Sequence, residues 1–263
     1  MTVTIHIGLG QVAATLALVA VAAAIALWER TDLEGDIAFA VGRSFIQLTA
    51  IGYVIKAIFA SDRILWVALL LAVMVVFGAL TARRRARRVP HAFWPLLIAL
   101  ASAAAATLAA VLALGVFPVK ARYLVPVGGM VIGNAMTAAA VALNRLGDEV
   151  HDAAGRIDAT LALGATATQA IRPIARRSLR SGMIPLIDST KTTGLIFFPG
   201  TMVGMLLAGA SPIDAVRLQL VLLYLLLGAV ALATLLAVLL ARRAFFTAEH
   251  QLRELPSTQP HPG

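Results

Sequence analysis

Apolar residues fill most of the chain in long stretches that are separated by short polar segments. The stretches lie roughly at residues 6–28, 37–60, 64–82, 92–116, 123–143, 184–208 and 214–241. Each reaches the ~20 helical residues that cross a hydrocarbon core about 30 Å thick. Lipid offers backbone groups no hydrogen-bond partner, and no short alternating strands are visible, so the stretches are expected to be helices. The pattern predicts an all-α, polytopic membrane helical bundle with about seven transmembrane helices.

Composition supports a membrane protein. Hydrophobic residues make up 60% of the chain and charged residues 13%, more apolar side chain than one soluble core could bury. No Lys or Arg precedes the first apolar stretch, which is also longer than the core of a secretory signal, so we expect it to remain as a helix. We therefore predict one transmembrane domain over residues 1–255 and a disordered tail over residues 256–263.

Positive charge predicts the orientation, because Lys and Arg concentrate in cytoplasmic loops. Arginines cluster at 83–88, 145–180 and 242–253, which fall on one side of the predicted bundle. The other side has few cations, among them Lys120 and Arg217. This places the N-terminus outside, the C-terminus inside, and the protein in the inner membrane as a multi-pass protein.

The net charge of +9 follows from this arrangement and predicts attraction to anionic lipid headgroups. A nucleic-acid interface would need aromatic residues interleaved on a soluble basic face, so no nucleic-acid partner is expected. The chain has no cysteine, which excludes a disulfide or a thiolate metal site. None of the five histidines forms a ligand pair at helical spacing, and a metal site remains unidentified.

Small residues recur at helical spacing in two of the predicted spans. Gly129 and Gly133 form one GxxxG pair, and Gly200 and Gly204 form another just after Pro199, which is expected to kink its helix. Such pairs let helix backbones approach closely in lipid. They predict either helix packing, including a dimer seam, or thin helices that line a translocation path.

Polar and sulfur-bearing residues within the spans are candidates for that path. Ionisable residues in spans are costly and are functional candidates by default, although an amide or methionine there often serves only packing. Asp188 and Lys191 are spaced for an ion pair within one helix. The candidates are Arg43, Gln47, Met130, Asn134, Asp188, Lys191 and Met202.

A basic insert over residues 144–183 interrupts the apolar pattern and is predicted to form two short amphipathic helices, the second broken near Pro173. Part of its spacing resembles EAAxxxGA, the loop by which bacterial ATP-binding-cassette import permeases dock on their ATPase. Asp replaces the Glu, and Arg176 and Arg177 stand where that motif ends in Leu-Pro. The residues that match are Asp158, Ala159, Gly164, Ala165 and Ile174.

Four stretches resemble the FetB-type permease family: RSFIQLTAIGYVIKAIF (43–59), VPVGGMVIGNAM (125–136), ALGATATQAIRPIARRSLRSGMIPLIDSTKTTGL (162–195) and FPGTMVGMLLAG (198–209). The resemblance covers about two thirds of the chain in the expected order. It implies the membrane subunit of an ATP-binding-cassette transporter. Its bacterial members are linked to iron export and oxidative-stress resistance, and its plant relatives to aluminium tolerance.

We therefore expect a permease subunit that exports metal ions, with iron the candidate, as a homodimer in contact with membrane lipid. None of the three lysines follows a glycine, so the chain lacks a Walker A loop and is expected not to be an enzyme. A separate ATPase subunit, carrying the ATP and Mg, would dock on residues 148–182. The alternative is a secondary transporter or channel that works without ATP. HExxH and GxSxG motifs are absent, which argues against an intramembrane enzyme.

Overall fold

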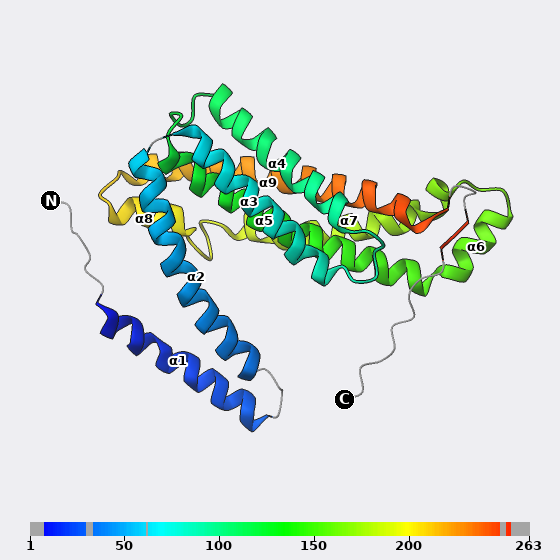
Figure 1. The fold of residues 1–263 in the computed structure, drawn as a ribbon, viewed down its shortest axis with the longest axis horizontal. Helices are drawn as coiled ribbons and strands as arrows, with labels where there is room; N and C mark the ends of the chain where they lie inside the picture. Colours follow the sequence, from blue (N-terminus) through cyan, green and yellow to red (C-terminus); the bar gives the residue numbers. More distant parts are fainter. Residues whose placement is uncertain (1–7, 30–33, 62, 248–250, 254–263) are drawn as a thin grey trace. The chain divides into compact units, whose positions relative to one another are not determined.

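The computed structural model describes residues 8–29, 34–61, 63–247 and 251–253. Within these residues every regular secondary-structure element is a helix (Figure 1). Within these residues the only β pairing is two isolated bridges. The tail expected at 256–263 lies outside the described residues. The helices are α1 (Leu9–Trp28), α2 (Glu34–Ser61), α3 (Ile64–Arg85), α4 (Phe93–Ala113), α5 (Ala121–Asp152), α6 (Ala154–Ala162), α7 (Ala167–Thr192), α8 (Gly200–Leu207), α9 (Pro212–Ala241) and the 3₁₀ helix η1 (Arg242–Phe245).

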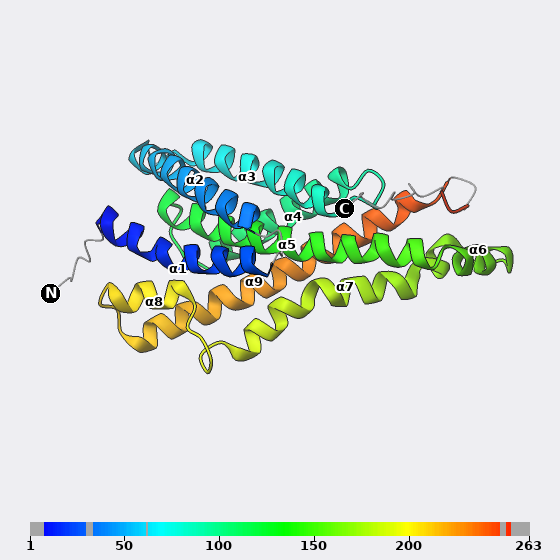
Figure 2. The same cartoon turned by 90° about the horizontal axis from the view of Figure 1, so that it is seen from below.

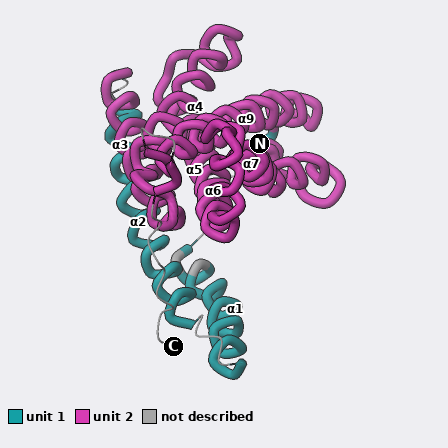
Figure 3. Tube along the Cα trace, turned by 90° about the vertical axis from the view of Figure 1, so that its right-hand side faces the viewer, with its two compact units in different colours: residues 1–63, 207–209 teal, residues 64–206, 210–263 magenta. Residues whose placement is uncertain are grey.

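The chain divides into two compact units, which are described separately (Figure 3). Unit 1 comprises residues 1–63 and 207–209, and in it α1 and α2 pack on each other. None of the most apolar 18-residue stretch of α2 is buried. A largely apolar helix that unit 1 leaves uncovered is suited to lipid or to another subunit.

Unit 2, residues 64–206 and 210–263, is a bundle with α5 at its centre. α5 packs against α3, α4, α7 and α9, and α4 also packs along α9 (Figure 2). Buried alanines recur every fourth residue on the facing sides, at Ala99 and Ala103 of α4 and at Ala229, Ala233 and Ala237 of α9. Small side chains at this spacing let two helices approach closely, so the Ala-rich composition of these helices produces the seam.

Among the described residues, five helices are long and apolar enough to cross a membrane, namely α2, α3, α4, α5 and α9 with its 3₁₀ extension. α1 contributes a shorter apolar stretch, Ala13–Trp28. The prediction of a multi-pass helical membrane protein is therefore confirmed. The count of seven spans and the orientation stay predictions.

The helix expected over residues 184–208 is not continuous. α7 ends at Thr192 and α8 begins at Gly200. Residues 193–199 between them are non-helical, and an isolated β-bridge joins Thr193 and Phe197. Gly194 has φ 85°, a left-handed conformation that ends a helix, and Pro199 cannot donate a backbone hydrogen bond. The two residues together turn the expected kink into a full break.

The break expected near Pro173 is also wrong, because α7 runs unbroken through Pro173 and Pro185. A proline in a helix loses one backbone hydrogen bond and crowds the preceding turn. α7 offsets this cost by packing along both α5 and α9. The basic insert is thus the end of α5, the short α6 and the first half of α7, which together form one helical hairpin (Figure 2).

Candidate functional site

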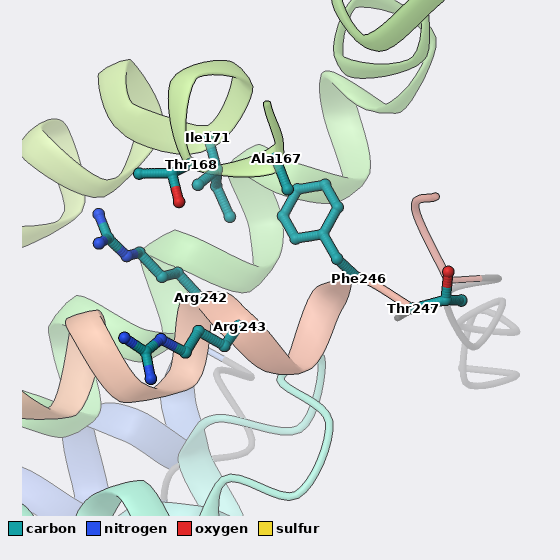
Figure 4. A pocket seen from close by; sticks show the side chains of 7 residues that line it. All are labelled: Ala167, Thr168, Ile171, Arg242, Arg243, Phe246 and Thr247. Carbon is teal, nitrogen blue, oxygen red and sulfur yellow. The ribbon is translucent and has the colours of Figure 1, made fainter. Parts of the chain in front are cut away.

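The basic segments of unit 2 gather at one end of the bundle, which we call the basic end. Arg88, after α3, bonds Asp148 near the end of α5. Where α9 ends, Arg242 and Arg243 line a cavity of about 340 Å³ with Thr168 and Ile171 of α7 (Figure 4). Arginine clusters that are far apart in the sequence therefore lie at the same end of unit 2.

The hairpin tip at this end is built by α6 and the turn that follows it. Gly164 has φ 89° and donates its backbone N–H to the Leu161 carbonyl at 2.9 Å, which closes α6. Thr166 then caps α7, since its hydroxyl accepts from the Gln169 N–H at 3.3 Å. The Gln169 side chain accepts from the Thr166 N–H at 2.8 Å. A left-handed glycine followed by a capping box fixes a sharp turn between two helices.

Most of the residues predicted to dock an ATPase are exposed on this tip. Asp158, Ala159 and Gly164 are exposed, and Ala165 is half-buried. Ile174 differs from them, because it is 1% exposed and packs inside the bundle, so it does not form part of the exposed surface. The neighbouring Leu163, which the motif did not include, is 89% exposed and extends the same surface.

Two adjacent carboxylates hold the base of the hairpin. Glu149 is 9% exposed and accepts from Arg145 Nε at 2.8 Å and from Arg177 Nε at 2.7 Å. The Arg177 bond joins α5 to α7. Charge-assisted bonds of this length are among the stronger polar contacts in proteins, and here the carboxylate is buried while the two arginines are half exposed. α5 and α7 are therefore tied together where they leave the apolar bundle.

Asp148 ties α5 to the loop between α3 and α4. Its Oδ1 accepts from Arg88 Nη1 at 2.9 Å, and its Oδ2 accepts from Asn144 Nδ2 at 3.2 Å. Gly147 lets the loop approach, because a Cβ there would lie 2.8 Å from Arg88 Cβ. The base of α5 is thus held by two adjacent residues, Asp148 bonding the loop after α3 and Glu149 bonding α7.

Gly182 sets the register of α7 in the bundle. A Cβ at this position would lie 2.6 Å from the Ala138 carbonyl oxygen, 2.8 Å from Ala142 Cβ and 3.1 Å from Thr234 Cγ2. Only glycine allows α7, α5 and α9 to meet this closely. Helices α7 and α5 pack without a gap here, so a shift of one is resisted by the other.

This register brings two of the predicted path residues to the same level. Gly182 faces the turn of α5 between Ala138 and Ala142, and the two helices run in opposite directions. Asp188 on α7 and Asn134 on α5 each lie about six residues, or about 9 Å, beyond that crossing. Both are exposed, and neither is covered by the bundle of its own chain.

Asp188 stands one turn before the break between α7 and α8. It pairs with Lys191 at 3.3 Å, and both side chains are largely exposed. The hydroxyls of Thr192 and Thr193 donate to the Ser189 carbonyl at 3.1 and 2.8 Å, and that of Thr192 also donates to the Asp188 carbonyl at 3.0 Å. In transporters, discontinuous helices of this kind typically mark binding sites. The break is therefore the strongest candidate for a substrate site in unit 2.

The remaining predicted residues are divided between core and surface. Met130 is half-buried against a cluster of Val111, Val127 and Leu222, and Met202 is 9% exposed. Arg43 and Gln47 are exposed on α2, where the Arg43 guanidinium lies 6.0 Å from the Phe39 ring centre. Both residues belong to unit 1.

Within the described residues, the predicted GxxxG pairs make little close contact between helices of this chain. A Cβ on Gly129 would meet only the flexible end of Met74, at 3.0 Å. A Cβ on Gly133, Gly200 or Gly204 would meet nothing within 4 Å. Close contacts within the bundle are made instead by Gly128, Gly147 and Gly182. The two GxxxG pairs stay predictions for contact with another molecule.

Sequence reasoning missed the two residues that hold the hairpin. Asp148 and Glu149 are adjacent acids in a segment that is otherwise basic, and this contrast was a usable signal for ion pairs. Their partners Arg88 and Arg177 are separated from them in sequence by a helix or more, so the pairing could not be predicted. Among the described residues, no cluster of three or more His, Cys, Asp or Glu forms a candidate metal site.

Comparison with known proteins adds a family model and several relatives. Residues 9–246 match the model described as "Uncharacterised protein family (UPF0014)". The chain is 39% identical to the UPF0014 membrane protein STAR2 of Oryza sativa, over 94% of this chain and 87% of that protein. It is 36% identical to Protein ALUMINUM SENSITIVE 3 of Arabidopsis thaliana, over 94% and 90%.

A bacterial relative is similar to a comparable degree. The chain is 37% identical to the "Probable iron export permease protein FetB" of Escherichia coli, over 92% of this chain and 93% of that protein. No solved structure matches the chain.

Proposed function

Because the chain belongs to the UPF0014 family, we propose that it is the membrane-spanning permease subunit of an ATP-binding-cassette transporter that exports metal ions. The relative in Escherichia coli is named as a probable iron export permease, which makes iron the first substrate to test. The chain would work as a homodimer in the inner membrane. ATP and Mg would be bound by a separate ATPase subunit.

The observation that carries this proposal is the direct mechanical connection between the exposed hairpin tip and the broken helix. α7 begins at the tip, at Ala167, and ends at Thr192 beside the break. From Arg177 to Asp188 it covers about 16 Å as one rigid element. A partner that moves α6 would therefore move the backbone at the break.

The arrangement of charge supports a cytoplasmic position for the tip. The arginines after α3, along the hairpin and after α9 meet at one end of unit 2. Concentrated Lys and Arg mark the cytoplasmic side of membrane proteins. The ATPase would bind the exposed face formed by Asp158, Ala159, Leu163 and Gly164.

Force from the ATPase would pass through the base of the hairpin. The Glu149–Arg177 pair and the close packing at Gly182 make α5 and α7 move together. The distances from Asn134 and Asp188 to the same residues of a second copy would then change. Coupling through a packed element with two arrangements is a recognised form of switching.

A second copy has a natural place on α5. The outer face of this helix exposes Gly133, Asn134 and Thr137, whose polar groups bond only within the helix, Asn134 Nδ2 to the Met130 carbonyl at 2.8 Å and Thr137 Oγ1 to the Gly133 carbonyl at 3.1 Å. Small and polar residues on an exposed membrane helix typically face another helix or a polar pathway.

Cysteine labelling tests the position of the tip, since the natural chain has no cysteine. Leu163 is 89% exposed at the tip, and Leu114 is 72% exposed at the opposite end of unit 2. A membrane-impermeant maleimide should label Leu163→Cys only from the cytoplasmic side and Leu114→Cys only from the outside. Labelling of Leu163→Cys from the outside would reject the proposal.

Co-purification tests the docking surface. Ala159→Arg should lower retention of the ATPase subunit at least tenfold, whereas Val119→Arg, at an exposed position of the opposite end, should leave it unchanged. Iron should stimulate ATP hydrolysis by the wild-type complex in proteoliposomes and accumulate on the trans side. Retention that is equal in the two variants would remove α6 as the docking site.

The alternative is a secondary transporter or channel, and the Asp188–Lys191 pair beside a broken helix favours it. Metal flux through the purified chain alone, driven by an ion gradient and insensitive to ATP and the ATPase subunit, would establish this alternative.

A further inference from the structure

A cavity at the basic end lies apart from the hairpin tip and the broken helix. It has a volume of about 620 Å³ and is formed by the end of α3 and the loop that leads to α4. Its walls carry Arg83, Arg84, Arg87 and His91. A space of this size, with cations from one short segment, is suited to a compact anionic group.

The arginines that line the cavity have no carboxylate to balance them. Within the described residues, none of Arg83, Arg84 and Arg87 forms an ion pair. Arg87 Nε donates only to the Arg84 carbonyl, at 3.2 Å. The neighbouring Arg88 differs, because it bonds Asp148 and holds the loop. The guanidinium groups are therefore available to bind an anion from outside the chain.

The surface beside the cavity is apolar. Leu80 lines the cavity and is 40% exposed, and Phe77, one turn earlier on α3, is 65% exposed. Trp94, at the start of α4, is 63% exposed. Tryptophan is enriched at the level of lipid headgroups, which places the cavity at the membrane boundary. The cationic surface thus lies next to an apolar surface, as the headgroup of a lipid lies next to its acyl chains.

The cavity wall is held in place by the rest of unit 2. Ala86 and Ala92 at the two ends of the loop are 1% and 2% exposed. His91 has φ 50°, the one described non-glycine residue with a positive φ. Residues in this conformation persist only where the surroundings determine them, and they concentrate at ligand-binding sites. The backbone that carries the arginines is therefore held in place.

We infer that this cavity binds the phosphate-bearing headgroup of an anionic phospholipid. Guanidinium groups bind phosphate oxygens in pairs of parallel hydrogen bonds. Basic pockets beside membrane helices on the cytoplasmic side are typical binding sites for anionic headgroups. The lipid would rest against the same loop that Arg88 ties to α5, so its binding would stabilise the base of the hairpin. This inference does not depend on the identity of the transported substrate.

Native mass spectrometry of the full chain in nanodiscs tests the site. Discs would contain phosphatidylglycerol and phosphatidylcholine, and the lipid that stays bound after release would be counted. The variant Arg83→Gln/Arg84→Gln/Arg87→Gln removes the cavity arginines. The control Arg172→Gln/Arg176→Gln/Arg180→Gln removes the same charge from exposed positions of α7 that do not line this cavity.

The cavity variant should lose phosphatidylglycerol affinity by on the order of 100-fold, because each arginine near an anionic surface contributes a roughly fivefold factor and three such factors multiply. The control should retain its bound lipid, and phosphatidylcholine should bind neither protein tightly. Equal loss in both variants would show general surface attraction and overturn the site. The site would also be overturned if the wild-type chain retained no lipid but bound soluble glycerol phosphate tightly. Retention of an acidic protein in place of lipid would overturn it as well.

Discussion

The sharpest test of the structure is the removal of the Glu149 carboxylate. Glu149 joins α5 to α7 through Arg177 and braces α5 through Arg145. If this residue ties the hairpin base, its loss should cost stability and also separate movement of the tip from movement at the break. Glu149→Ala and Arg177→Ala, singly and together, measure the connection between the two helices.

The expected magnitude follows from burial. Breaking a buried ion pair by removing one partner costs about 3–5 kcal/mol. The Glu149 side chain is 10% exposed, but those of Arg145 and Arg177 are 56% and 52% exposed, so water can solvate the arginines that remain. We therefore expect Glu149→Ala to lower the free energy of unfolding by about 2 kcal/mol. The coupling energy between Glu149 and Arg177 should be about 1–2 kcal/mol.

The assay is reversible unfolding of the purified chain in detergent, with the four proteins of the double-mutant cycle. The pair Asp188–Lys191 provides a control, because it lies at 3.3 Å with side chains 60% and 69% exposed. Exposed pairs of this kind couple by about 0.5 kcal/mol or less. In complex with the ATPase, Glu149→Ala should retain binding but lose transport more than ATP hydrolysis.

Two results would refute the reasoning. A Glu149–Arg177 coupling energy no larger than that of the Asp188–Lys191 control would show that the buried geometry adds nothing. Full transport by Glu149→Ala would show that the base of the hairpin does not transmit movement.

Three further substitutions test other parts of the structure. Gly182→Ala should destabilise the bundle by roughly 2 kcal/mol because its Cβ has no space, whereas Gly228→Ala, at an exposed position of α9 where a Cβ meets nothing within 4 Å, should not lower the melting temperature in detergent. Gly164→Ala should strain the left-handed turn by about 1 kcal/mol and speed tryptic cleavage of the hairpin. Gly155→Ala in α6 should slow the cleavage, because alanine favours a helix more than glycine does. The reverse order of cleavage rates would contradict the left-handed conformation of Gly164. Gln219→Leu should leave chemical stability unchanged or raise it by about 1 kcal/mol, since the buried amide oxygen has no partner in the described structure; a clear loss would reveal a bond to it.

The number and length of apolar stretches determined the class of fold, because a chain with so much apolar surface has few stable arrangements outside lipid. The sequence also located the basic hairpin and the glycine at its tip. These features depend on residues close together in the chain, where spacing and local backbone preference carry the information.

Other features required the tertiary structure. Hydropathy could not show the break after Thr192, since Leu195–Phe198 are as apolar as the helices around them and the interruption follows from backbone conformation at Gly194 and Pro199. The burial of Ile174 could not be predicted from the motif spacing, because it depends on which face of α7 meets α5 and α9. Spacing within one helix does not report what lies beside it.

The same distinction separates the glycines. Gly133 and Gly182 are both glycines in long helices, yet one faces open space and the other lies where three helices meet. The sequence determined that small residues were present, but only the packing of α5, α7 and α9 decided which of them had to be small. Ion pairs such as Glu149–Arg177 were likewise decided by packing, because their partners are brought together across the bundle by apolar burial that any single segment leaves undetermined.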